Sequence, residues 1–149
     1  MIFAGEVFVM RAAVKIFITL VSAAALCVAV ALSPQKLAFE CGDSYTFFVG
    51  DSSKNCKVIT VTSGAELKKL TLTDVCGEAT SFKSLNLQSF LKSVNGEIVF
   101  EETLSDSVNY YCTADLPYSV TLYGKRINLH ICVKEQGVTV ASPIIFGGY

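Results

Sequence analysis

Six cysteines and one histidine are the residues of this 149-residue chain best suited to redox, metal or nucleophilic chemistry. The cysteines are Cys27, Cys41, Cys56, Cys76, Cys112 and Cys132. No two of them have the C-x2-C spacing of typical zinc sites, and His130 stands alone, so the pattern argues against a metal centre. Six thiols in a short chain instead predict disulfides, and the pairing stays open at this point.

His130 can act as a general base only if a nucleophile lies within hydrogen-bond reach. Its neighbours Leu129 and Ile131 place it in a strand-like run, and no G-x-S-x-G motif occurs. The sequence therefore predicts a strand residue on the less buried face of a sheet, or a partner of a backbone carbonyl. We expect no enzyme, no catalytic residue and no cofactor. A hydrolase with an unrecognised site is the alternative, which replacement of His130 by alanine tests.

Two of the cysteines continue alternating apolar segments. Alternate side chains of a strand point to the same face, so Cys41 shares a face with Leu37 and Phe39, and Cys112 shares one with Tyr110. A disulfide that joins two packed sheets lies between such faces. Cys41 with Cys112 is therefore the first pairing to expect.

The N-terminal part of the chain is typical of an export signal. Residues 11–32 read RAAVKIFITLVSAAALCVAVAL, two basic residues followed by an apolar stretch with small residues at 22–25. This order indicates a secretory signal peptide over residues 1–25, with cleavage near Ala25. The apolar stretch also has about the ~20 residues that span a bilayer, so a retained signal anchor is the alternative. Export places the thiols where disulfides persist.

The rest of the chain reads as short strands separated by turn residues. Strand-like segments rich in Val, Ile, Thr and aromatic residues occur at 28–32, 36–41, 45–49, 57–62, 69–73, 97–101, 107–113, 119–123 and 126–133. Gly124-Lys125 is expected as a two-residue hairpin turn of type II′. Residues 81–93 are expected as a short helix or an ordered loop. This spacing predicts an all-β sandwich or barrel.

Charge excludes one class of partner and indicates another. The chain has 12 basic and 13 acidic residues, a formal net charge of -1, which is too weak for the basic footprint of a nucleic-acid binder. Two small basic sites occur, Lys68-Lys69 and Lys125-Arg126, the second beside the expected turn. Because loop tips often carry binding residues, Lys125 and Arg126 are candidate contacts for an acidic glycan or cell surface. The alternative is that they serve solubility.

Several short motifs follow one another in a distinctive order. They are Cys27, Leu32-Ser33-Pro34, Phe39-Glu40-Cys41-Gly42, Cys56 and Cys76, a Ser/Leu-rich stretch at 84–91, and strand-like runs into Cys112 and Cys132. In this order they resemble the SAG-related surface antigen (SRS) domain of coccidian, hence apicomplexan, parasites, over about residues 27–140. The related 6-cysteine domains of malaria parasites share the architecture.

The resemblance implies a disulfide-stapled β-sandwich with Greek-key-like connections over residues 26–141, preceded by a signal peptide helix and followed by a short tail at 142–149. It implies three nested bridges: Cys27–Cys132, Cys41–Cys112 and Cys56–Cys76. It also places cleavage just before Cys27. The family commonly has two such domains and a glycolipid anchor signal, whereas the terminal ASPIIFGGY lacks the apolar tail of such a signal. The chain can therefore be expected either as a soluble secreted member of the family or as a truncated copy of a longer anchored antigen.

The function implied by the resemblance is that of a parasite surface or secreted antigen. It would act as a non-catalytic adhesion or host-ligand-binding module, for host-cell glycans and immune modulation. The alternative is a secreted inhibitor or immune-evasion decoy that blocks a host protein through an exposed loop such as 116–118. The expected partner is thus a host-cell surface glycan or protein, outside the cell or on its surface, and a homodimer stays open.

Overall fold

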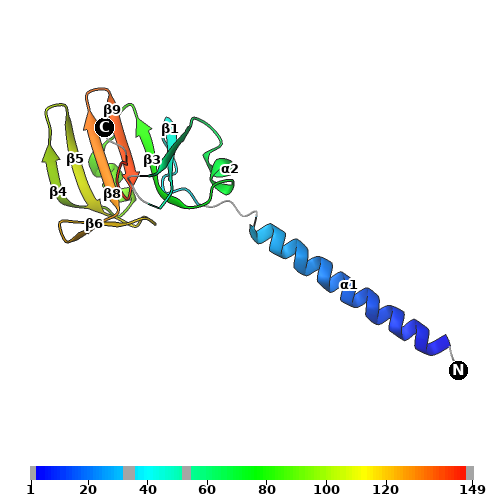
Figure 1. Ribbon diagram of the computed structural model, residues 1–149. Helices are drawn as coiled ribbons and strands as arrows, with labels where there is room; N and C mark the ends of the chain where they lie inside the picture. Colours follow the sequence, from blue (N-terminus) through cyan, green and yellow to red (C-terminus); the bar gives the residue numbers. More distant parts are fainter. Residues whose placement is uncertain (1–2, 32–35, 52–54, 147–149) are drawn as a thin grey trace. The chain divides into compact units, whose positions relative to one another are not determined.

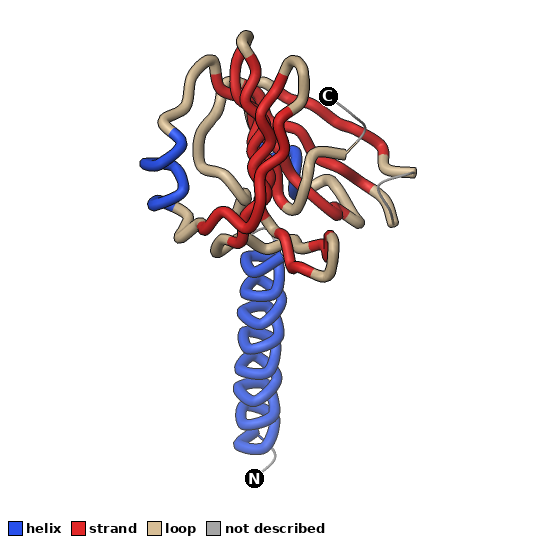
Figure 2. The backbone as a smooth tube through the Cα atoms, turned by 90° about the vertical axis from the view of Figure 1, so that its left-hand side faces the viewer, coloured by secondary structure: helices blue, strands red, loops and turns tan. Residues whose placement is uncertain are grey.

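The computed structural model describes residues 3–31, 36–51 and 55–146. The chain divides into two compact units, Met1–Pro34 and Gln35–Tyr149. The first contains a single helix, α1 (Phe3–Ala31), which is continuous from end to end (Figure 2). Within the described residues, no helix is long and apolar enough to cross a membrane.

The strand expected at residues 28–32 is wrong, because Val28 to Ala31 form the last turn of α1. Alanine has the highest helix propensity, and the run at 23–25 carries the helix into this Val- and Ala-rich segment. Cys27 therefore lies on a helix. Leu32, the last residue of the expected strand, lies outside the described residues.

The second unit is mostly β, as expected, and is built on an antiparallel sheet of seven strands in the order β2-β1-β3-β9-β8-β5-β4 (Figure 1). The strands of this sheet are β1 (Ser44–Val49), β2 (Lys57–Val61), β3 (Val75–Phe82), β4 (Glu97–Thr103), β5 (Ser107–Thr113), β8 (Leu129–Lys134) and β9 (Gly137–Ser142). A separate hairpin contains β6 (Val120–Leu122) and β7 (Lys125–Ile127), and the connections contain α2 (Ala65–Leu70) and α3 (Leu87–Ser93). Two packed sheets were expected, whereas the described strands form one large sheet and this hairpin.

Each face of the large sheet has its own apolar cluster. On the first face, side chains of the central strands, among them Phe47, Leu129 and Ile131, are fully buried. Phe90 of α3 covers them, with its ring centroid 6.3 Å from that of Phe39. On the second face, the segment after β9 lies over the sheet, and Phe146 meets Phe48 edge to face at 5.0 Å.

The strand expected at residues 36–41 is wrong, because this segment is irregular. Side chains, rather than a neighbouring strand, accept its backbone N–H groups: Ala38 N–H donates to Glu78 at 2.9 Å and Phe39 N–H to Tyr45 at 3.2 Å. The period-2 argument therefore does not hold here: Phe39 is buried, whereas Cys41 is exposed.

The strand expected at residues 69–73 is also wrong. Lys69 and Leu70 end α2, and Thr71 caps it, with its N–H and hydroxyl bonded to the carbonyl of Lys68. The alternation of KLTLT resembles a strand, but the preceding AELKK is made of strong helix formers, which extend the helix into it.

The helix expected within residues 81–93 is shorter, because β3 ends at Phe82 and α3 begins after its N-cap Asn86, which accepts from Ser89 N–H at 3.0 Å.

The single strand expected over residues 126–133 is divided at Asn128. The side chain of this residue accepts from Ala114 N–H at 2.6 Å and donates to the Ala114 carbonyl, replacing a ladder contact.

The hairpin turn is shifted by one residue from Gly124-Lys125. Leu122 pairs with Lys125, and Tyr123 (φ 51°) and Gly124 (φ 74°) both have positive φ, as in a type I′ turn rather than type II′.

Candidate functional site

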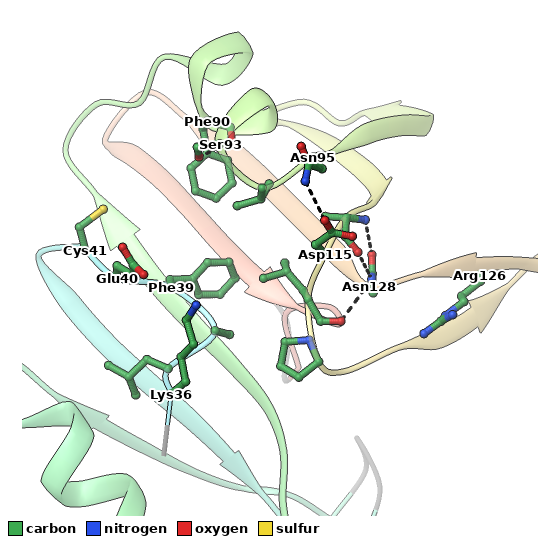
Figure 3. Close-up of a pocket in the computed structure, with 16 residues that line it drawn as sticks. Lys36, Phe39, Glu40, Cys41, Phe90, Ser93, Asn95, Asp115, Arg126 and Asn128 are labelled. Atoms are coloured by element: carbon green, nitrogen blue, oxygen red, sulfur yellow. Dashed lines mark hydrogen bonds between the residues drawn. The ribbon is translucent and has the colours of Figure 1, made fainter. Parts of the chain in front are cut away.

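A cavity of about 1060 Å³ lies between the segment 36–41, the end of α3 with its following turn, the loop 114–117 and β7 (Figure 3). Its apolar wall contains Phe39, Phe90 and Leu116. Four charged residues line it, two basic and two acidic: Lys36, Arg126, Glu40 and Asp115. Figure 3 shows Lys36 and Arg126 at opposite ends of the cavity.

The polar wall of the cavity is held by a chain of hydrogen bonds. Asn95 Nδ2 donates to Asp115 Oδ2 at 2.7 Å, and the backbone N–H of Asp115 donates to the carbonyl of Val94 at 2.9 Å. Asn128 holds Ala114 on both of its backbone groups and contacts the carbonyl of Leu116 at 3.4 Å. The loop 114–117 is therefore fixed from both sides, and the cavity is formed before any ligand arrives.

Beneath the segment 36–41, Glu78 is the centre of a buried polar cluster. Its side chain is 0% exposed, and Lys69 Nζ lies 2.6 Å from Oε1. The hydroxyl of Tyr118 also donates to Oε1, at 2.7 Å, and that of Tyr45 donates to Oε2. Burial alone would raise the pKa of Glu78, but the N–H of Ala38 and the donors just named lower it.

Glu78 was not among the residues predicted to be functional, and Lys69 was predicted to form a small basic site with Lys68. That prediction is wrong for Lys69, which is 6% exposed and also donates to the carbonyl of Lys36 at 2.7 Å. Lys68 is half-buried. One signal was present in the sequence: Glu78 is the only charged residue in VCGEATSF, a segment of small and apolar residues.

The single histidine is buried in the large sheet. His130 is 1% exposed, so the prediction of a less buried face is wrong. Its Nδ1 accepts from Ile145 N–H at 3.3 Å, which leaves Nε2 to donate to Asn109 Oδ1 at 3.2 Å. Its ring stacks on Tyr111 at 4.5 Å. Burial lowers the pKa of His130 to about 4, so the imidazole is neutral at neutral pH.

The structure separates some of the cysteines and brings others together. Cys112 is buried in the first-face core, whereas Cys132, opposite Asn109 in the register, lies on the second face. Cys56 and Cys76 pack against the same cluster around Phe48, and Cys76 Sγ donates to the Phe48 carbonyl at 3.3 Å. Burial, and then the neighbouring Cys56, raise the pKa of Cys76. Among the described residues none of the three expected bridges is formed.

The basic pair at the hairpin is where the sequence analysis expected it. Lys125 and Arg126 are exposed on β7, and Arg126 also lines the cavity of Figure 3. The rest of that cavity was not anticipated, because its walls come from four segments spread over about 90 residues of the chain. In the part of the chain that the structure describes, no three His, Cys, Asp or Glu side chains are grouped as a metal site requires.

No family model, no curated protein and no solved structure matches this chain.

Proposed function

We propose that this chain is a secreted or cell-surface antigen of a parasite, and that it binds a host-cell glycan or protein without catalysing a reaction. The observation that carries the proposal is the position of Arg126, which belongs both to the exposed basic pair of the hairpin and to the preformed cavity. An anionic glycan that contacts Lys125 and Arg126 on the surface can extend a group into the cavity toward Lys36.

The partners of the most buried titratable groups support binding rather than chemistry. Glu78 accepts hydrogen bonds from four donors, and both ring nitrogens of His130 hold structural hydrogen bonds. A general base or nucleophile has to exchange protons with a substrate, and these groups are committed to the fold. The charged residues of the cavity, in contrast, lie on its open walls.

We expect Arg126→Ala to weaken binding of a sulfated glycan by about tenfold, because it removes a charge-assisted contact. Heparin is the probe, and binding is measured by surface plasmon resonance at fixed salt. Lys57→Ala is the matched control, since Lys57 is an exposed base on β2 that does not line the cavity. Equal affinity of the Arg126 variant and the parent protein would contradict a basic glycan site at this position.

The alternative, a decoy that blocks a host protein, is favoured by the loop 116–118. Leu116 and Pro117 line the same cavity, and the Tyr118 hydroxyl is anchored on buried Glu78, so this loop presents an apolar surface in a fixed position. A glycan array and a pull-down of host-surface proteins separate the two candidates. The decoy function predicts that the parent protein and the Arg126→Ala variant both retain a host protein in the pull-down, and that the Leu116→Ser variant does not.

The bridges implied by the resemblance belong to the same proposal: Cys27–Cys132, Cys41–Cys112 and Cys56–Cys76 staple the β-domain after export. The proximity of Cys56 and Cys76 supports the third of these. We expect the secreted protein to contain no free thiol at either position, and Cys56→Ser/Cys76→Ser to destabilise the domain by about 2–4 kcal/mol. Peptide mapping without reductant, together with urea unfolding, measures both. Alkylation of native Cys56 or Cys76 by iodoacetamide would exclude that bridge.

A further inference from the structure

A second pocket, of about 400 Å³, lies on the second face of the sheet beside the hairpin, separate from the cavity of Figure 3. It is lined by residues of β4, β5 and β8, of the hairpin and of the segment after β9: Phe100, Glu101, Glu102, Tyr111, Leu122, Tyr123, His130, Ile144 and Ile145. Its walls are therefore mostly aromatic and aliphatic, and the charged side chains among these described residues are two glutamates.

The aromatic rings are arranged in a row that ends in a corner. Phe100 stacks on Tyr111 at 4.5 Å, and Tyr111 stacks on His130 at 4.5 Å. Tyr123 meets Phe100 at 5.8 Å with an interplanar angle of 72°. Because a cation binds within about 6 Å of a ring centroid, one cation in this corner can contact both Phe100 and Tyr123.

Two backbone irregularities place these rings. The register of β4 on β5 shifts between Ile98 and Phe100, and this bulge sets Phe100 opposite Tyr111. Tyr123 has a φ of 51°, a conformation that costs free energy for a bulky residue, and its side chain is 91% exposed. Turns of this type usually have Asn or Gly there. A large aromatic residue in a strained and solvated position is explained by a ligand that covers it.

The charge of the pocket selects the class of ligand. Glu102 lies opposite Asn109, on the same face as Phe100 and Tyr111, and its Oε2 lies 3.4 Å from the Tyr111 hydroxyl. Among the described residues that line the pocket there is no Lys or Arg, and buried His130 is neutral. Aromatic faces with carboxylates at one side attract a cation that is also apolar, and a trimethylammonium group has both properties.

We propose that the corner formed by Phe100 and Tyr123, with Glu102 beside it, binds the trimethylammonium group of a choline-like molecule. This inference is independent of the glycan site proposed above, since Arg126 and Lys36 do not line this pocket. The group packs its methyls on the two rings and on the aliphatic wall of Leu122 and Ile145, while the carboxylate of Glu102 balances its charge.

Calorimetric titration of the purified secreted protein with choline tests the proposal, and the neutral isostere 3,3-dimethylbutan-1-ol is the matched ligand. We expect choline to bind about tenfold more tightly than the isostere, because only the cation interacts with the ring faces and the carboxylate. Equal affinities, or no binding of choline, would overturn the proposal.

Variants and a second probe assign the site and the source of the group. Tyr123→Leu and Glu102→Gln are each expected to weaken choline binding about threefold to tenfold. Glu97→Gln, an exposed glutamate on the same strand, serves as the control and should bind choline as the parent protein does. Tyr123 is exposed, so its variant will fold; unchanged affinity in it would overturn the assignment. If the protein sediments with phosphatidylcholine vesicles and the Tyr123→Leu variant does not, the trimethylammonium group belongs to a lipid headgroup. If the protein binds choline but does not sediment with the vesicles, the ligand is a free molecule.

Discussion

Replacement of Glu78 by alanine is expected to destabilise the β-domain by about 3–5 kcal/mol, because removal of one partner leaves the other charge buried without compensation. The ammonium of Lys69, 6% exposed, would retain only the carbonyl of Lys36. The hydroxyls of Tyr45 and Tyr118 and the N–H of Ala38 would lose their acceptor as well. Urea unfolding at pH 7 measures the loss.

A double-mutant cycle separates the ion pair from the hydrogen bonds. Glu78→Gln keeps an acceptor for only one of the two tyrosine hydroxyls and leaves Lys69 unpaired, so it should also destabilise the domain strongly. Adding Lys69→Met removes the unpaired charge and should recover part of that loss. Glu97→Gln, exposed on β4, is the control and should change stability by less than about 0.5 kcal/mol. An unfolding midpoint of Glu78→Gln equal to that of the parent protein would contradict the role assigned to this cluster.

The importance of Glu78 comes from the segments that it joins. Its four donors come from the segment 36–41, β1, α2 and the loop before β6, so one carboxylate fixes the part of the chain that forms the cavity wall. A buried ion pair adds little to stability compared with an apolar pair of the same size, but it specifies one arrangement. We therefore expect Glu78 variants that still fold to lose heparin binding as well.

The strands that could be predicted from the sequence are rich in aromatic and β-branched residues. In β1 and β5, buried residues alternate with half-buried ones over most of the strand, and their predicted bounds agree with the structure to within a residue. β3 and β9 were missed. Residues 77–80 of β3 are all buried, so no alternation marks the strand, and the segment includes Gly77 and Glu78. β3 and β9 lie in the middle of the sheet, where both faces are covered.

Gly77 shows why this central strand does not look like one. A Cβ at this position would lie 2.9 Å from the carbonyl oxygen of Ser142 and 3.0 Å from the ring of Phe146, so the segment after β9 packs directly on the backbone of β3. Glycine weakens a strand in general, but it is needed where another chain segment approaches closely. Such a contact between residues far apart in the sequence cannot be read from local patterns.

The same reason explains how much of the candidate site was predicted. Arg126 was found because a basic pair beside a turn is a local signal. The polar wall, with Asn95, Asp115 and Asn128, was missed, since it forms only when α3, β7 and the loop 114–117 meet. Asn128 in particular interrupts a run that reads as a continuous strand, and its side chain replaces backbone contacts.

The stability of the domain is expected to fall by about 2 kcal/mol between pH 7.5 and pH 5, through His130. Burial lowers its folded pKa to about 4, from an ordinary value near 6.5. The unfolded chain therefore binds a proton in this range that the folded chain does not, so stability is complete above about pH 6.5 and is lost as the pH falls toward 4. Urea unfolding at several pH values measures the slope, in a range where the carboxylates stay largely ionised.

A matched variant and a direct measurement test whether His130 causes this slope. His130→Gln retains a polar group near Asn109 but does not titrate, so its stability should be nearly constant from pH 7.5 to 5. Because the chain has one histidine, the imidazole C2 proton gives a single NMR resonance in the folded protein, and its titration should be centred near pH 4. A midpoint near 6.5 would mean that water reaches the imidazole in solution. The stacking on Tyr111 and the hydrogen bond from Ile145 N–H would then not be maintained.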